Sequence, residues 1–319
     1  VTVSDVDGAV EAQGLQFASD GYVLTGDALT LTGPDGEIRV GDGSAASSGY
    51  QATVANVISG NSGLMKTGEG TLILSGLNNY VGDTVISAGT LHAVADEALG
   101  DASNRVVLNG GTLRASGSIV ERQSLALGNQ GGTLWLDSSA DVDDDLSGAG
   151  TLTLAGGNTL SLYGNNDFSG GLSIADGVLQ GESSALGTGF IENNGGLVLL
   201  DSGQAQLAND LSGSGYVNLD NGGEIRLTGN NALFSGDFTI ANGALIGDVD
   251  AFGSATIDNQ SRLVLDQAAD GIFDNALSGG GALEKTGSGT VSLDQDAVAF
   301  SGNTVIQQGR LNANSNWSS

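Results

Sequence analysis

Short runs of alternating apolar and polar residues recur along the whole chain. In each of the segments 72–74, 152–154, 217–219 and 291–293, the first and third residues are large and apolar. The middle residue would point to the opposite face of a strand. A period of two is typical of a strand with one buried face. No segment has the periodicity of an amphipathic helix of any length. The pattern therefore predicts many short strands separated by turns.

Glycine-rich corners separate these runs. The chain has 54 Gly and a single Pro, and Asn, Asp and Gly cluster at 109–111, 176–177, 194–196 and 221–223. These residues supply the positive φ angles that tight corners require. At 39 % hydrophobic residues, the chain has enough apolar side chains to bury a core, which a disordered Gly-rich tract lacks.

A motif recurs four times with a fixed internal spacing. In each copy an Ile lies three residues before a Gly, and a Leu lies two residues after it. The four glycines are Gly89, Gly177, Gly243 and Gly309. The intervals between these glycines are multiples of about 22 residues: the first is four times this length, and the next two are three times this length. A unit of about 22 residues suits one coil of a β-solenoid with three short strands.

A second motif supports the same period. Ile-Ser-Gly or Leu-Ser-Gly starts at Ile58, Leu146, Leu211 and Leu277, and an aromatic residue follows one such period later in each copy. Stacking of like side chains one coil apart explains this spacing. An antiparallel stack of hairpins is the alternative fold, because Asn-Gly between apolar runs also predicts hairpins. The long period favours the solenoid.

We therefore expect an all-β fold, a right-handed parallel β-helix or single-stranded β-solenoid, with about 14 coils of roughly 22 residues. One continuous elongated domain is expected, with N-terminal coils over 1–53 and a repeat-built shaft over 54–319. The expected units of the shaft are 54–100, 101–187, 188–253 and 254–319. The interval from Gly177 to Gly243, and the one from Gly243 to Gly309, should then each hold three whole coils.

The charge is strongly negative, with 37 acidic against 9 basic residues and a formal net charge of -28 at pH 7. Nucleic acids and anionic membranes bind clustered Lys and Arg, so both roles are disfavoured, and we expect no nucleic-acid partner and no direct membrane insertion of this segment. The chain has no Cys, which excludes disulfides and cysteine-ligated metals. No stretch approaches the roughly 18 apolar residues of a membrane-spanning helix. Because the chain starts at Val1 without a signal-type segment, we expect a piece of a longer precursor.

Two copies of the repeat share a longer signature. Lys66-Thr67-Gly68 opens a segment that continues through Tyr80 to Leu91. Lys285-Thr286-Gly287 opens a segment that continues through Phe300 to Leu311, with one inserted residue before the aromatic. The intervening copies lack the Lys-Thr-Gly opening. These segments resemble the passenger-associated transport repeat of bacterial autotransporters, which use type V secretion.

That resemblance implies a cell-surface location and a route of export. The passenger would cross the outer membrane of a Gram-negative bacterium through a C-terminal barrel of the precursor and fold outside as a β-helix. Neither the barrel nor a terminal cap is recognisable in the sequence. The implied function is an adhesin or self-association module for aggregation, biofilm growth or host attachment. Its partners would be another copy of the chain, or host and matrix surface ligands, bound along the side of the rod.

The alternative function is a non-catalytic stalk of a secreted protease or esterase whose catalytic domain lies outside this chain. We expect no enzymatic activity, no cofactor, and no catalytic or metal site, and the sequence does not identify partner-binding residues. His92 is the only histidine and is expected to face solvent, without forming a triad with Asp83 or Asp96. A β-helix enzyme acting on acidic glycans is disfavoured, because the arginines are dispersed. They include Arg105, Arg114, Arg122, Arg226, Arg262 and Arg310.

Three further groups have two possible roles each. The acidic run 141–145 could bind calcium but lacks an EF-hand pattern, so a solvated loop is favoured. The pairs Asn78-Asn79, Asn165-Asn166 and Asn230-Asn231 precede aromatic residues. They could form a receptor-facing stripe, but a corner ladder of stacked amides is favoured. Trp135, Tyr163 and Tyr216 are candidate exposed platforms for sugars or ordinary packing residues.

Overall fold

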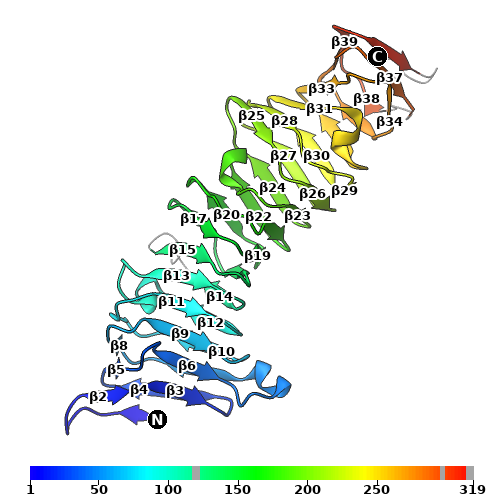
Figure 1. Ribbon diagram of the computed structural model, residues 1–319. Coiled ribbons are helices and arrows are strands. Elements are labelled where there is room, and N and C mark those ends of the chain that lie inside the picture. The colour runs from blue at the N-terminus through cyan, green and yellow to red at the C-terminus, as the bar shows by residue number, and fades with distance from the viewer. Residues whose placement is uncertain (117–122, 295–298, 314–319) are drawn as a thin grey trace. The chain divides into compact units, whose positions relative to one another are not determined.

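The computed structural model describes residues 1–116, 123–294 and 299–313. The chain forms two compact units, Val1–Gly170 and Gly171–Ser319. Within each unit the described strands pair in parallel with strands of the neighbouring coil, as Figure 1 shows. The predicted parallel β-helix is therefore confirmed, and the coils number about 15. The division at residues 53 and 54 stays a prediction.

The first unit has its strands on three sides. The sheet on one side holds β1 (Thr2–Val3), β4 (Tyr22–Gly26), β7 (Gln51–Val54), β10 (Thr71–Leu74), β12 (Thr90–Ala93), β14 (Thr112–Ala115), β16 (Gly132–Leu136) and β19 (Leu152–Ala155). A second holds β3 (Gly14–Phe17), β6 (Glu37–Val40), β9 (Leu64–Thr67), β11 (Thr84–Ile86), β13 (Arg105–Leu108), β15 (Ser124–Leu127) and β18 (Ser147–Gly148). The remaining strands are β2 (Val10–Ala12), β5 (Leu29–Leu31), β8 (Ile58–Ser59), β17 (Ala140–Val142) and β20 (Thr159–Leu162). Two 3₁₀ turns, η1 (Ala45–Gly49) and η2 (Asp96–Leu99), lie between strands.

The second unit repeats this plan. Its longest sheet holds β22 (Val178–Gly181), β24 (Gly196–Leu199), β27 (Tyr216–Leu219), β30 (Asp237–Ile240), β32 (Thr256–Asn259), β35 (Leu277–Gly279) and β38 (Ala299–Phe300). The next holds β25 (Gln204–Leu207), β28 (Glu224–Leu227), β31 (Ala244–Gly247), β33 (Arg262–Asp266), β36 (Ala282–Thr286) and β39 (Thr304–Ile306). The others are β21 (Leu172–Ile174), β23 (Ile191–Asn193), β26 (Leu211–Gly213) and β29 (Leu233–Phe234), and then β34 (Gly271–Phe273), β37 (Thr290–Leu293) and β40 (Arg310–Ala313). The 3₁₀ turns are η3 (Ser183–Ala185) and η4 (Val249–Phe252).

Columns of identical or similar apolar side chains fill the interior. In the first unit, Leu72, Leu91, Leu113, Leu134 and Leu154 lie one above another in register, and each is at most 1 % exposed. The residue between two such positions on a strand points outward, because successive side chains of a strand alternate between its faces. The alternation seen in the sequence therefore separates the core from the outer surface.

The second unit corrects the relation between repeat and coil. Val178 pairs with Gly196 and Tyr216 pairs with Asp237, so the coils there differ in length and are shorter than the repeat period predicts. The strands that follow the repeated glycines are β22, β31 and β40, and they belong to three different sheets. The interval between two of these glycines therefore spans three coils plus one further strand. The expectation of three whole coils is wrong.

The lysine of the Lys-Thr-Gly opening is an interior residue. Lys66 is fully buried, and its Nζ donates hydrogen bonds to the carbonyl oxygens of Gly68 at 2.7 Å and of Ala88 at 2.9 Å. In the second unit Lys285 is also fully buried and donates to Gly287 at 2.8 Å. These are the only two lysines of the sequence. The charged end of each side chain satisfies turn carbonyls that the apolar core cannot.

Candidate functional site

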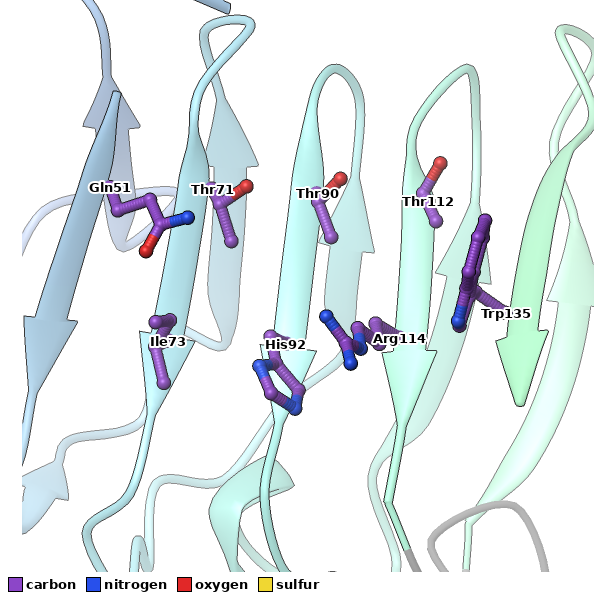
Figure 2. Close-up of a pocket in the computed structure, with 8 residues that line it drawn as sticks. All are labelled: Gln51, Thr71, Ile73, Thr90, His92, Thr112, Arg114 and Trp135. Atoms are coloured by element: carbon purple, nitrogen blue, oxygen red, sulfur yellow. The ribbon is translucent and has the colours of Figure 1, made fainter. Parts of the chain in front are cut away.

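An open groove lies on the outer face of the sheet that contains β7, β10, β12, β14 and β16. Its volume is about 390 Å³. We call it the threonine groove. Its lining residues are Gln51, Thr71, Ile73, Thr90, His92, Thr112, Arg114 and Trp135, which Figure 2 shows projecting from adjacent strands.

The strand register builds the groove from two rows of side chains. Thr71, Thr90 and Thr112 align in one row, and Thr133 continues their alignment on β16. Within the described residues, the hydroxyl groups of these threonines have no hydrogen-bond partner. Neighbouring strands of a sheet lie about 4.8 Å apart. The row therefore offers a hydroxyl group at a regular spacing along the stack of coils.

The second row combines different chemistry. Ile73, His92, Arg114 and Trp135 are in register on four successive strands. Trp135 is 44 % exposed, which leaves a large part of its indole ring open to solvent. An aromatic ring of this kind has a flat apolar face and a polar edge, and both can contact a ligand.

Two residues just beyond the strands anchor this row. Arg114 Nε donates to both carboxylate oxygens of Asp137, at 3.0 and 2.9 Å, and Ser116 Oγ donates to Asp137 Oδ2 at 2.7 Å. The hydrogen bond from Arg114 lowers the pKa of Asp137 below its ordinary value. The guanidinium group is thereby held in place while its two terminal nitrogens have no partner within the described residues.

His92 is part of this cluster and not a free surface residue. Its Nε2 lies 3.2 Å from Ser116 Oγ and 3.7 Å from Asp137 Oδ2. Burial, and then the nearby positive charge of Arg114, lower the pKa of His92, so the imidazole is neutral at pH 7. The expectation that His92 faces solvent is therefore only partly correct, because its side chain is 18 % exposed.

The cluster does not have the geometry of a hydrolytic triad. In a triad the imidazole lies between the serine and the carboxylate and uses a different nitrogen for each. Here Ser116 and Asp137 bond directly to one another and face the same nitrogen, Nε2. Asp83 pairs instead with Arg105 at 2.7 Å, and the side chain of Asp96 lies outside the part that the structure describes.

A second hollow, of about 620 Å³, lies in the second unit on β25, β28 and β31. Arg226, which lines this hollow, forms an ion pair with Asp266, because Arg226 Nη1 lies 2.8 Å from Asp266 Oδ2. Beside it, Arg262 bridges Glu224 and Glu284. Arg105, Arg114, Arg226 and Arg262 thus each pair with a nearby carboxylate. Arg310 is exposed, and Arg122 lies outside the described residues.

One Asn of each predicted pair ties neighbouring coils together. Asn78 is buried, accepts a hydrogen bond from Ile58 N at 2.8 Å and donates one to Ala98 O at 2.6 Å. Asn231 makes the equivalent two contacts in the second unit, and the buried Asn166 accepts one from the coil before it. The other Asn of each pair is exposed, namely Asn79, Asn165 and Asn230. These amides bond to backbone groups of neighbouring coils, and the ladder of stacked amides stays a prediction.

The other candidates are not brought together into one site. Tyr163 and Tyr216 are 56 % and 41 % exposed, but neither lines the threonine groove. Asp141, Asp143, Asp144 and Asp145 are exposed, as a solvated segment should be. Within the described residues no group of three or more His, Cys, Asp or Glu side chains is arranged to hold a metal ion.

Comparison with known families identifies the repeats. The family described as Passenger-associated-transport-repeat matches residues 64–93, 147–180, 220–246 and 283–313. The chain is a segment of an autotransporter passenger. Passengers of this family are exported through the outer membrane of Gram-negative bacteria and exposed at the cell surface. Among the described residues of this passenger segment, no helix has the length and apolar character to cross a membrane.

Three relatives share parts of this passenger segment. It is 39 % identical over 222 residues to the Adhesin BmaC autotransporter of Brucella suis biovar 1 (strain 1330), an alignment of 68 % of this chain and 6 % of that protein. It is 29 % identical over 247 residues to the Uncharacterized lipoprotein YdeK of Escherichia coli (strain K12), covering 74 % of this chain and 19 % of that protein. Identity to the Extracellular serine protease of Serratia marcescens is 44 % over 85 residues, or 25 % of this chain and 8 % of that protein.

The passenger segment thus spans less than a fifth of each of these relatives. No solved structure matches it.

The sequence did not reveal Ser116 or Asp137 as partners of His92. Their separations of 24 residues from His92 to Ser116 and 21 from Ser116 to Asp137 are the signal that could have found them, since both are close to one coil.

Proposed function

We propose that this passenger segment is an adhesive module without catalytic activity of its own. It would attach the bacterial cell to a surface ligand, or to another cell through a second copy of the passenger. The observation that carries the proposal is the threonine groove, an open outer surface with unpartnered hydroxyl groups among the described residues and an exposed indole ring. Such a surface offers contacts to a ligand but no arranged nucleophile, base or metal within the described part of the chain.

The similarity to the Brucella relative supports this role, because that protein is named an adhesin. The rod-like stacking within each unit supports it also. Many weak contacts along such a surface can add up to firm attachment when several passengers on one cell engage together.

The alternative is a stalk that holds a catalytic domain away from the cell surface. This possibility is supported by the similarity to the Serratia protein, which is named a protease. That similarity extends over 85 residues. Reading the precursor gene upstream of Val1 separates the two. A globular domain with a nucleophile motif there would favour the stalk.

Display of the full precursor on a non-aggregating Gram-negative strain tests the adhesive role. We expect displaying cells to settle faster than the parent strain, or to attach to matrix-coated surfaces on which the parent does not remain. Surface staining confirms that equal amounts of passenger are displayed. If displaying cells stay dispersed and attach to nothing, the adhesive role is wrong.

A further inference from the structure

The threonine groove differs from the rest of the molecule in its charge. The protein as a whole carries a formal charge of -28, but the charged groups that form the groove cancel. Arg114 is paired with Asp137, and His92 is buried enough to lower its pKa and remain neutral at pH 7. A charged ligand thus gains little at the groove itself. An anionic one is also repelled by the remainder of the surface.

The chemistry of the lining groups is that of hydroxyl recognition. Thr71, Thr90 and Thr112 present side-chain hydroxyls that can both donate and accept a hydrogen bond. The terminal nitrogens of Arg114 add donors whose position is set by the Nε contact with Asp137. Gln51 contributes an amide at one end of the groove. Ligands with many hydroxyl groups can satisfy these donors and acceptors together.

Trp135 lies at the other end of the groove from Gln51 (Figure 2). Its exposed indole face is apolar, and covering it removes apolar area from water, at about 25 cal/mol per Å². The ring CH groups of a pyranose form a flat apolar patch of similar size, while its hydroxyl groups point outward around the edge. A sugar ring stacked on Trp135 therefore leaves its hydroxyls free for Arg114 and the threonines.

The spacing of the strands favours a chain of sugars over a single one. Successive threonines lie one strand apart, at about 4.8 Å, which is comparable to the length of one pyranose ring in an extended glycan. A linear glycan lying across the strands would thus meet equivalent groups at successive sugars.

From these features we propose that the threonine groove binds a linear uncharged glycan, with one sugar ring stacked on Trp135 and its hydroxyls bonded to the threonine row. The proposal rests on the adhesive function above and names the class of ligand. It also assigns roles. Trp135 is the stacking platform, the threonines are hydroxyl partners, and Asp137 positions Arg114.

The test uses cells that display the full precursor and flow cytometry with oligosaccharides that carry an uncharged BODIPY dye. Cellohexaose and chitohexaose serve as uncharged probes, and a hyaluronan hexasaccharide serves as the anionic probe. The parent strain corrects for binding to other cell-surface components. We expect the uncharged probes to bind displaying cells and the hyaluronan probe to bind at least about tenfold more weakly.

Variants locate the binding. Trp135→Ala should weaken binding of the uncharged probes about tenfold, and Thr112→Val should weaken it about threefold by removing one hydroxyl at constant shape. Tyr216→Ala removes an exposed aromatic in the second unit, outside the groove, and should bind as the unchanged chain does. Equal surface staining and equal resistance to added protease show that each variant folds.

Three results would overturn the proposal. These are no binding of either uncharged probe at millimolar concentration, binding of the anionic probe alone, and equal losses for Trp135→Ala and Tyr216→Ala. Adhesion of cells that bind no glycan would reject this ligand class while leaving the adhesive function standing. Capture of labelled soluble passenger in place of the glycans would identify a second copy as the occupant.

Discussion

Lys66 on β9 donates a hydrogen bond from Nζ to the carbonyl oxygen of Ala88, which lies 22 residues further along the chain, at 2.9 Å. The same ammonium group also bonds to the carbonyl oxygens of Thr67 and Gly68. A buried cation that serves carbonyl groups of its own coil and the next one joins the two coils. This gives the Lys-Thr-Gly opening of the repeat a structural reason.

Removing this cation should weaken the solenoid. Lys66→Met keeps the length and apolar stem of the side chain but leaves three turn carbonyls without that donor. We expect a loss of about 1–3 kcal/mol in the free energy of unfolding. Urea unfolding of the purified chain measures it. The control is Arg105→Met, which breaks an exposed ion pair with Asp83 and should cost less than about 1 kcal/mol. Equal losses would contradict the assigned role.

Lys66 also predicts a dependence on pH. Burial lowers the pKa of Lys66 in the folded chain from 10.5 to about 8. Between these two values the unfolded chain binds more protons than the folded chain, so this residue makes stability rise with pH over that interval. The rise is up to about 3 kcal/mol. Burial raises the pKa of Tyr80, so Tyr80 makes stability fall with pH at high pH. This contribution is the same in the unchanged chain and in the Lys66→Met variant.

The measurement is therefore a difference. We expect the stability of the unchanged chain minus that of Lys66→Met to grow when urea unfolding is repeated at about pH 7.5, 9 and 10. A difference that stays constant over this range would show that Lys66 has the same pKa in both states.

The adjacent residues Asn78 and Asn79 offer a matched pair. Asn78→Ala removes the side chain that links Ile58 N to Ala98 O and leaves two buried backbone groups without partners. We expect a loss of about 2–4 kcal/mol. Asn79→Ala changes an exposed side chain and should stay within about 0.5 kcal/mol. Thermal unfolding followed by circular dichroism compares the two, and a similar melting temperature for both would contradict the proposed link.

The repeated glycines should tolerate no side chain. Gly243 has φ +94°, and a Cβ there would lie 2.2 Å from the carbonyl oxygen of Gly223. Gly243→Ala should therefore destabilise the second unit by more than about 2 kcal/mol. Gly203 has nothing within 4 Å of an added Cβ. Gly203→Ala is the control and should be nearly neutral by the same urea assay.

Association between displayed passengers should increase with ionic strength. Two copies that each carry -28 repel one another, and the screening length falls from about 30 Å at 0.01 M salt to about 8 Å at 0.15 M. We expect cells that display the precursor to settle faster at the higher salt concentration. Settling that slows with salt would instead indicate that ion pairs hold the copies together.

The fold could be predicted because its main signal is local. The alternation at residues 72–74 places Leu72 and Leu74 inward whatever the coil length, and glycines with positive φ mark the corners. The exact relation of repeat to coil could not be predicted. The regular intervals between the repeated glycines suggested whole coils, but the shorter coils of the second unit fit three coils plus a strand into the same length.

The groove depended on information that the sequence does not show directly. Thr71, Thr90, Thr112 and Thr133 follow one another at unequal intervals, so no constant period aligns them. Turns of different length absorb the differences and restore the register. The exposed position of Trp135 could be proposed from its type, but its neighbours Arg114 and His92 required the register.

The displacement of the repeat by one strand gives the second unit a screw-like arrangement. Copies that begin at β22, β31 and β40 present their equivalent side chains toward three different directions. A flat partner that recognises one copy cannot reach the next one from the same side. Adding one more repeat would therefore lengthen the solenoid and place the equivalent side chains of the new copy on a different side from those of the copy before it. A substitution in one copy then alters one side of the solenoid and leaves the other sides unchanged.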